Sequence, residues 1–321
     1  MNERPVQDVM TNPRADRVRK VARLAGRSSR VREGLFLAEG PQSAREALRA
    51  HLGLLGPGLV PDAGPAPGAL GSAPDVPGPP AAGAAVAQWI PGRVLDSVYV
   101  SPRVAERDPG LADLVRQAAA RGLPVRHATD EVLDAMADAV TGQGIIAVCR
   151  IPETDARSVY AGLVAPRLVA VLCRVQDPGN AGTILRAADA SGADAVVLTS
   201  GSVDVFNPKV VRSTAGSLFH VPLVTAADAA EAAGELRGYG LTVLAADGYG
   251  TVRLDRPPSR LLSGPTAWLF GNEAQGLSPA ELELAAERVA VPLYGKAESL
   301  NVATAATVCL YASAMAQHAE T

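Results

Sequence analysis

The sequence predicts an α/β fold, with a parallel sheet in its second half and a smaller α/β unit in its first half. Short apolar runs alternate with helical patterns, which is typical of strand–helix–strand units. The run LVAVLC at 168–173 is apolar throughout, as in a strand buried on both faces of a parallel sheet. The chain has 321 residues, 48% of them hydrophobic, which at roughly 150 residues per domain is enough for two domains with sizeable cores.

The first half begins with an arginine-rich stretch of helical composition at residues 12–32. The elements expected after it are strands at 35–38, 94–101, 124–126 and 144–149, and helices at 43–52, 111–121 and 130–137. Residues 54–92, rich in Pro, Gly and Ala, interrupt this order. Such a composition cannot bury enough apolar surface to offset its ordering entropy. We interpret the segment as a flexible insertion and not as a domain boundary.

The second half shows a stricter alternation after residues 151–166, which have the composition of a connector. We expect a substrate domain at 12–150 and a second domain at 160–321. The elements expected in the second domain are strands at 168–173, 195–199, 241–246, 266–270 and 289–292, and helices at 180–191, 208–216, 226–237, 279–286 and 300–318.

The charge of the chain is uneven. The formal net charge is −3, which by itself argues against a protein that coats nucleic acid through bulk positive charge. Residues 12–32, however, hold eight of the thirty basic residues and one acid, Asp16, so this segment carries +7 and the remainder −10. Aromatic residues are only 4%, which argues against a base-stacking platform for single strands.

Targeting and cysteine patterns indicate a cytoplasmic protein. The first ten residues lack a basic stretch followed by an apolar one, and no apolar run is long enough for a transmembrane helix. Cys149, Cys173 and Cys309 are odd in number, far apart and within apolar runs, so we expect buried thiols, with no disulfide framework and no metal site.

The first segment that could carry chemistry is DPGNAGTILR at 177–186, which follows the buried strand at 168–173. Asn180 is placed to cap the next helix, and Gly182 permits a close backbone approach. Arg186, six residues after Asn180, lies near the same helix face. A plain strand–turn–helix joint with a surface arginine explains the spacing equally well. The segment matches neither a GxGxxG fingerprint nor a P-loop.

Two further segments also follow apolar strands. LFGNEAQGLS at 269–278 places polar side chains between Gly271 and Gly276, and its end, SPAE, is a capping box that makes Ser278 structural. VPLYGKAESLNVA at 291–303 leads into the last helix, where Glu298 or Ser299 would be the cap. Because the carboxyl ends of parallel strands meet at one sheet edge, we expect all three segments to gather there.

The three segments, in this order, resemble the three sequence motifs of the SpoU (TrmH) family of RNA ribose 2′-O-methyltransferases, in the SPOUT class. PGNAGTILRAA resembles the first motif, LFGNEAQGLS the second and VPLYGKAESLNVATAA the third. VREGLFLAEG at 31–40 and QGIIA at 143–147 resemble the family's L30e-like substrate-binding extension more weakly.

The resemblance implies a deep trefoil knot near the carboxyl end, which holds S-adenosylmethionine in a bent shape. Periodicity alone would not suggest a knot, because knotted chains are rare. The family's cofactor contacts come mostly from the backbone. Carried over to this sequence, the cofactor-binding positions are Phe270, Gly271, Asn272, Val291, Pro292, Leu293, Leu300, Asn301 and Ala303.

The resemblance also implies an active site of Asn180, Arg186, Glu273, Ser299 and Asn301, without a metal. The ribose 2′-hydroxyl attacks the sulfonium methyl group, and the family assigns activation of this hydroxyl to the first-motif arginine, here Arg186. Since a free guanidinium has a pKa above about 12, we expect Arg186 to position the hydroxyl and the adjacent phosphate. The other four side chains would orient Arg186, the ribose and the methionine moiety.

Two positions depart from the family pattern: Ala274 stands where many members have Gly, and Ala303 where many have Ser. We expect altered detail and retained activity, because both residues are small. The family implies a homodimer, and the predicted helix at 300–318 could serve as core or as the dimer face.

We therefore expect a methyltransferase acting on 23S rRNA, because the amino-terminal domain favours a folded rRNA target. A tRNA substrate or an antibiotic-resistance role stays open, as does a non-catalytic RNA-binding or ribosome-assembly protein on the same fold. For the arginine-rich segment we expect phosphate contacts, although a solvated helix face also explains it. The candidate RNA-binding residues are Arg14, Arg17, Arg19, Lys20 and Arg23.

Overall fold

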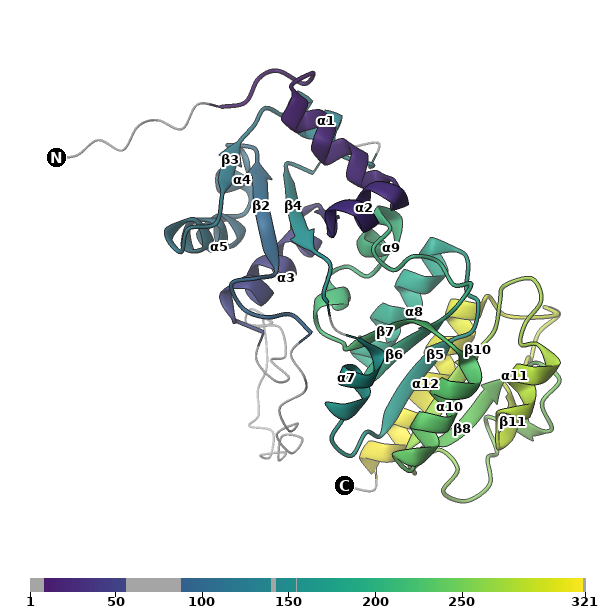
Figure 1. Ribbon diagram of the computed structural model, residues 1–321. Helices are drawn as coiled ribbons and strands as arrows, with labels where there is room; N and C mark the ends of the chain where they lie inside the picture. The colour runs from purple at the N-terminus through teal and green to yellow at the C-terminus, as the bar shows by residue number, and fades with distance from the viewer. Residues whose placement is uncertain (1–8, 56–87, 140–142, 154, 320–321) are drawn as a thin grey trace, which may run out of the picture.

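Two β-sheets lie side by side, each with helices on both of its faces (Figure 1). The computed structural model of the chain describes residues 9–55, 88–139, 143–153 and 155–319. Most of the insertion expected at 54–92 lies outside these residues. The smaller sheet comes from the first half of the chain and the larger from the second half, so the expected α/β class is confirmed.

The smaller sheet has four strands in the order β1-β4-β2-β3, which are β1 (Leu35–Glu39), β4 (Ile145–Arg150), β2 (Leu95–Val100) and β3 (Val125–His127). β4 is antiparallel to both of its neighbours, and β3 is parallel to β2. Alternate residues of the strands face two separate cores. One is covered by α3 (Pro41–Leu52) and α5 (Pro109–Ala120), the other by α1 (Asp16–Ala22) and α6 (Asp130–Met136).

The arginine-rich stretch is helical, as expected, but it is divided into three pieces. α1 continues into the 3-10 turn η1 (Arg23–Ala25), the chain is extended at Gly26, and α2 (Arg27–Glu33) follows. Gly34 ends α2 with a left-handed backbone. A short helix, α4 (Val104–Arg107), lies between β2 and α5.

The larger sheet is parallel throughout, in the strand order β7-β6-β5-β10-β8-β11-β9. The strands β6 (Ala195–Thr199) and β10 (Thr266–Phe270) match the predicted bounds. The other strands are β5 (Leu168–Leu172), β7 (Leu223–Ala227), β8 (Thr242–Ala246), β9 (Val252–Arg253) and β11 (Glu287–Ala290).

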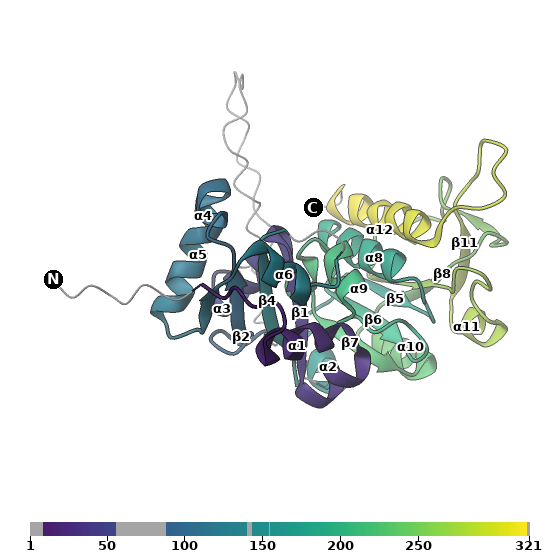
Figure 2. The same cartoon turned by 90° about the horizontal axis from the view of Figure 1, so that it is seen from above.

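Helices cover both faces of this sheet (Figure 2). α8 (Pro178–Ala190) and α12 (Val302–Ala319) pack together on one face, and α7 (Ala156–Ala161) and α10 (Ala229–Gly238) contribute to the core on the other. The remaining elements are α9 (Pro208–Ser213), η2 (Ser217–Phe219) and α11 (Pro279–Glu283).

Three predictions about elements were wrong. Residues 151–166 are not merely a connector, because α7 buries Val159 and Tyr160 in the core of the larger sheet. The strands β7 and β9 were missed. The helix expected from residue 226 begins at Ala229, because Asp228 caps it and the residues before it pair with β6.

The two halves share a continuous core at their junction. Phe36 of β1 lies against Phe206 and Phe219 of the second half, with ring centroids 4.9 and 6.3 Å away. Trp89 completes this aromatic cluster, and its indole N–H donates to the Leu218 carbonyl at 3.3 Å. Packing of these four large rings, three of them buried, resists rotation of one half against the other.

Ion pairs reinforce this junction. Arg212 of α9 donates to Glu39 at 2.7 Å and to Asp138 at 3.0 Å, both in the first half. Arg30 of α2 is 2% exposed and donates to Asp204 at 2.6 Å. Buried charges of this kind persist when they are paired and hydrogen-bonded, so each contact fixes the position of α2 or β1 against the second half.

No helix among the described residues is both long and apolar enough to cross a membrane. Cys149, Cys173 and Cys309 are free and buried, as expected. Burial raises the pKa of Cys309 to about 12, so its thiol stays protonated and unreactive at neutral pH. The trefoil knot stays a prediction.

Candidate active site

The three motif segments lie at the carboxyl edge of the larger sheet. The first follows β5 and enters α8, the second is the loop after β10, and the third connects β11 to α12. β5 and β10 are neighbours in the sheet, and β11 is separated from β10 by β8 alone. The expected gathering of the segments at one edge is confirmed.

A chain of side-chain hydrogen bonds joins the three segments. Asn301 Nδ2 donates to Asn180 Oδ1 at 2.9 Å. Asn180 Nδ2 in turn donates to Glu273 Oε1 at 3.2 Å. One residue of each motif therefore takes part, although the three are far apart in the sequence.

Glu273 is held by the backbone at the start of the first motif. The N–H groups of Asp177 and Gln176 donate to its carboxylate at 3.0 and 3.2 Å. Partial burial by itself would raise the pKa of Glu273. The hydrogen bonds outweigh this effect, so the pKa is lowered from its ordinary value; they come from the backbone of Glu273 itself, from Asp177 and Gln176, and from the Asn180 side chain. Glu273 is therefore an ionised acceptor at neutral pH and a weak base.

The caps of both site helices differ from those predicted. Asp177, not Asn180, caps α8, and its carboxylate accepts from the Asn180 N–H at 2.8 Å. Asn301, not Glu298 or Ser299, caps α12, since its Oδ1 accepts from the N–H groups of Ala303 and Thr304. The Asn180 side chain is thereby free to bridge the other two motifs.

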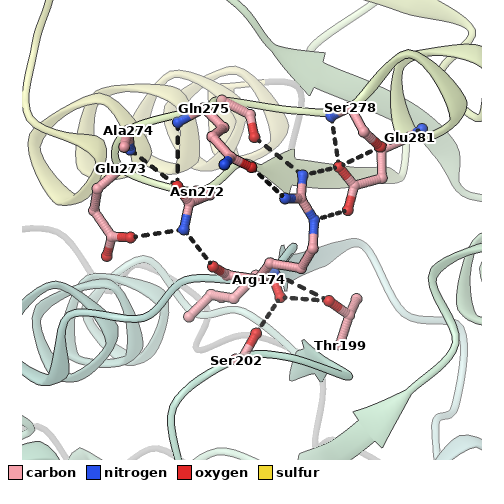
Figure 3. Close-up of polar contacts among 11 residues, drawn as sticks. Arg174, Thr199, Ser202, Asn272, Glu273, Ala274, Gln275, Ser278 and Glu281 are labelled. Carbon is pink, nitrogen blue, oxygen red and sulfur yellow. Dashed lines mark hydrogen bonds and ion pairs between the residues drawn. The ribbon is translucent and has the colours of Figure 1, made fainter.

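Arg174, which the sequence did not single out, anchors the second motif loop (Figure 3). Its guanidinium makes two bonds to Glu281, with Nε–Oε1 at 2.9 Å and Nη2–Oε2 at 2.6 Å. The same group donates to the Gly276 carbonyl at 3.3 Å. Glu281 also closes the predicted capping box with Ser278, which is confirmed. The available signal was an arginine directly after a buried strand, at the sheet edge where ligands bind.

The second motif loop is closed on itself. The N–H of Asn272 donates to the Gly276 carbonyl at 3.0 Å, and the Gly276 N–H donates back at 2.8 Å. The Asn272 side chain donates to the Arg174 carbonyl at 2.9 Å. A Cβ on Gly271 would lie 2.3 Å from the Gly276 carbonyl carbon, so the sequence needs glycine at this crossing.

The third motif loop is open by comparison. From Pro292 to Leu300, no backbone N–H or C=O forms a hydrogen bond within the described part of the chain. Leu293 and Leu300 are exposed on it, whereas Ala303 is buried at the start of α12. The loop thus combines available backbone donors and acceptors with apolar side chains.

Two of the predicted catalytic residues are not joined to this chain of hydrogen bonds. Ser299 is exposed in the third loop, and Arg186 is exposed on α8; neither forms a hydrogen bond or ion pair within the described residues. Arg186 lies two turns into α8, and its side chain is exposed to solvent.

Sequence and structure comparisons fit this arrangement. Residues 167–311 match the model of the SpoU rRNA Methylase family, and residues 84–155 match that for RNA 2′-O ribose methyltransferase substrate binding. The 23S rRNA (guanosine(2553)-2′-O)-methyltransferase RlmP of Bacillus subtilis is 40% identical over 192 residues, which are 59% of this chain and 72% of RlmP. The chain belongs to the SpoU rRNA methylase family.

Two solved structures extend the likeness over nearly the whole chain. A crystal structure of an RNA 2′-O ribose methyltransferase superposes with a TM-score of 0.69 and 26% identity, covering 97% of this chain and all of that one. The SpoU methyltransferase AviRb from Streptomyces viridochromogenes, in complex with AdoMet, gives 0.68 and 25%, covering 94% and 98%. The SpoU fold is therefore shared from the amino-terminal sheet to α12.

Proposed function

We propose that this SpoU family member transfers a methyl group from S-adenosylmethionine to a ribose 2′-hydroxyl of 23S rRNA. The observation that carries the proposal is the hydrogen-bonded chain Asn301–Asn180–Glu273, which unites the three motifs at one sheet edge. A relative that shares 40% identity is named as a 23S rRNA guanosine 2′-O-methyltransferase, which supports both the reaction and the class of RNA.

The residues at this edge suit the cofactor. Adenine recognition needs backbone donors and acceptors beside an apolar slot. The loop from Pro292 to Leu300 has such groups available, and Leu293 and Leu300 supply apolar surface. Residues 270–272 lie at the end of β10, on the same edge. When bound, S-adenosylmethionine supplies an electrophilic methyl group on a sulfonium.

The side chains then have distinct parts. Glu273, ionised and held by two backbone N–H groups, fixes the amide of Asn180. Asn180 fixes Asn301, which is also the cap of α12, so the entrance of that helix is set relative to the first motif. We assign Arg186 to positioning the ribose hydroxyl and its neighbouring phosphate, and Ser299 to contacts with the methionine moiety.

A second copy of the chain would complete the site. α12 exposes an apolar stripe of Val308, Tyr311 and Met315, of which Met315 is 64% exposed. Tyr311 packs across to α8, where its hydroxyl donates to the Ala190 carbonyl at 3.3 Å. Arg186 is exposed on α8 about one turn before Ala190, so a copy covering the stripe would also approach Arg186 and shield it from water. We therefore assign the chain to homodimers that pair through α8 and α12.

Transfer of tritium from methyl-labelled S-adenosylmethionine tests the function directly. The acceptors are 23S rRNA and tRNA pools from a strain that lacks the gene, with pools from the parent strain as control. We expect label in the 23S rRNA of the deletion strain. The label should lie at one nucleotide, where the 2′-O-methyl group makes the adjacent phosphodiester bond resistant to alkaline cleavage. Label in tRNA alone would move the proposal to tRNA, and no label in either pool would contradict it.

A further inference from the structure

Arg174 lies between β5 and the first motif, outside all three motif segments, and its backbone is strained. Its φ is 56°, in the left-handed region that side chains other than glycine rarely adopt. Strain of this kind persists only where the surroundings fix it, and it gathers at active sites and ligand clamps. An arginine in this conformation at the sheet edge therefore needs contacts that hold it there.

Two hydrogen bonds hold the Arg174 backbone from opposite sides. Its N–H donates at 3.1 Å to the hydroxyl of Thr199, the last residue of β6. Its carbonyl accepts from the side chain of Asn272, in the loop after β10, at 2.9 Å. Since β6 and β10 flank β5 in the sheet, the strained turn is held by both neighbours of the strand that it ends.

The Arg174 side chain reaches the far end of the second motif loop (Figure 3). Besides the two bonds to Glu281, Nη2 donates to the Gly276 carbonyl at 3.3 Å and Nη1 to Gln275 Oε1 at 3.4 Å. Asn272 and Gly276 are themselves joined by two backbone hydrogen bonds. Arg174 thus holds both ends of the closed loop, one through its carbonyl and the other through its guanidinium.

Glu281 sets the direction of the guanidinium. It is 6% exposed, and its carboxylate also accepts from the Ser278 N–H at 2.7 Å and the Ser278 hydroxyl at 2.9 Å. Burial by itself would raise the pKa of Glu281, but the hydrogen bonds from Arg174 and Ser278 outweigh it, so the pKa is lowered. A buried, ionised Glu281 requires a cationic partner, and it ties Arg174 to the cap of α11.

The loop held in this way carries candidate cofactor positions. Asn272 is one of them, and the next residue, Glu273, belongs to the hydrogen-bonded chain that unites the motifs. Glu273 in turn accepts from the N–H groups of Gln176 and Asp177, which follow Arg174 closely in the sequence. The exit of β5 and the second motif loop therefore hold each other, and a shift of Arg174 would move both.

We propose that Arg174, through Glu281, is a positioning residue for S-adenosylmethionine, which keeps the second motif loop in its closed shape before the cofactor binds. This inference rests on the proposed function for the identity of the ligand. Arg174 acts through the loop, because its guanidinium already donates to Glu281 and to the loop itself. A ligand binds more weakly by the fraction of protein whose site is not formed, so a loop formed in advance raises affinity without a new contact.

A purely structural role for the pair makes a different prediction. Removal of one partner leaves a buried charge without compensation, whereas replacement of both by apolar residues is often close to neutral for stability. The Gly276 carbonyl loses its charged donor in either case. Stability and cofactor affinity should therefore separate if Arg174 positions the loop, and should change together if it only stabilises the fold.

The test uses three variants of the full chain. Arg174→Met removes the guanidinium, and Arg174→Met with Glu281→Leu removes the pair. Arg212→Met is the matched control at the junction of the halves: the side chains of Arg212 and its partner Glu39 are 28% and 4% exposed, against 29% and 8% for Arg174 and Glu281. Calorimetry measures the Kd of S-adenosylmethionine, thermal melting the stability, and NMR the amide hydrogen exchange of Gly276 without cofactor.

Both single variants should melt several degrees below the wild type, because each leaves a buried carboxylate unpaired. Arg174→Met should raise the Kd of S-adenosylmethionine about tenfold, which corresponds to a closed loop in about a tenth of the molecules. The double variant should recover most of the melting temperature and keep the raised Kd. The Gly276 amide should exchange faster in both Arg174 variants, whereas Arg212→Met should match the wild type in Kd and in exchange.

Three results would overturn the proposal: an unchanged Kd in Arg174→Met, a Kd that recovers with the melting temperature in the double variant, or an equal rise in Arg212→Met. The binding measurements need neither RNA nor turnover. A wild type that binds S-adenosylmethionine but transfers no methyl group to RNA would therefore contradict the proposed reaction, while the affinities alone decide the assignment of Arg174.

Discussion

Protonation of His220 should stabilise the junction between the two halves of the chain. Its ring Nδ1 lies 2.8 Å from Asp189 of α8, and its Nε2 lies 3.2 Å from Glu46 of α3, so the imidazolium donates to both halves. These bonds, first to Asp189 and then to Glu46, raise the pKa of His220 from 6.5 to about 9, against the opposing effect of burial. The perturbation we consider is His220→Gln.

The magnitude follows from linkage. A rise from 6.5 to about 9 corresponds to about 3.4 kcal/mol at about 1.36 kcal/mol per pKa unit. The His220 side chain is 34% exposed, and solvent screening reduces this to roughly 1.5–2 kcal/mol. Because the folded-state pKa is the higher one, the contribution is complete below about pH 6.5 and disappears as the pH rises through about 9.

Urea unfolding at pH 6 and pH 9.5 measures the effect, with tryptophan fluorescence as the signal because Trp89 lies in the junction. The wild type should exceed His220→Gln by about 1.5–2 kcal/mol at pH 6 and by under about 0.5 kcal/mol at pH 9.5. Asp189→Asn serves as the control. In the His220→Gln background it should lower the free energy of unfolding little further, because the imidazolium that pairs with Asp189 is already absent. A difference that is constant between the two pH values, or that grows with pH, would refute the reasoning.

Three further variants test the packing and the site. Gly182→Ala would place a Cβ 2.4 Å from Ser213 Cβ and 2.8 Å from the Val210 carbonyl oxygen. The free energy of unfolding should therefore fall by about 3 kcal/mol. Gly234→Ala is the control, because its Cβ would meet open space and should not destabilise the fold. Arg186→Ala should lower methyl transfer at least about 10²-fold, with S-adenosylmethionine affinity unchanged by calorimetry; retained turnover would exclude its assigned role. Met315→Glu should give a monomer in sedimentation and lose transfer, and a dimer would contradict the α12 interface.

Much of the larger sheet could be predicted, because buried parallel strands are continuous apolar runs. The bounds of β6 and β10 match the prediction, since both strands are fully buried. β7 escaped detection because its second half is exposed and leads into an alanine-rich helix. Gly182 was expected to permit a close approach, and the structure shows that the approaching atoms belong to α9: Ser213 Cβ and the backbone at Val210 and Ser213.

The candidate site was predictable in place but not in its contacts. Strand order brings the three loops to one edge, yet it does not say that Asn180 and Asn301 bond to each other across 121 residues. The capping assignment of Asn180 failed because α8 begins earlier, with Pro178 at its first turn. Arg174 went unnoticed because its partner, Glu281, is 107 residues away and no local pattern connects them.

The arginine-rich segment shows most clearly why charge in a sequence is not charge available to a ligand. Arg30 has the same local surroundings in sequence as its neighbours, but it is 2% exposed and committed to Asp204 and two carbonyls. Arg19 is matched by Asp16 one turn away. Arg121, Arg126 and Arg150, by contrast, line the same groove as Arg17 and Lys20, although they come from parts of the chain that have no unusual charge density. The positive surface that the fold presents is therefore assembled from separate parts of the chain. Removing Arg30 should displace α2 and so disturb this surface, although Arg30 itself does not line the groove.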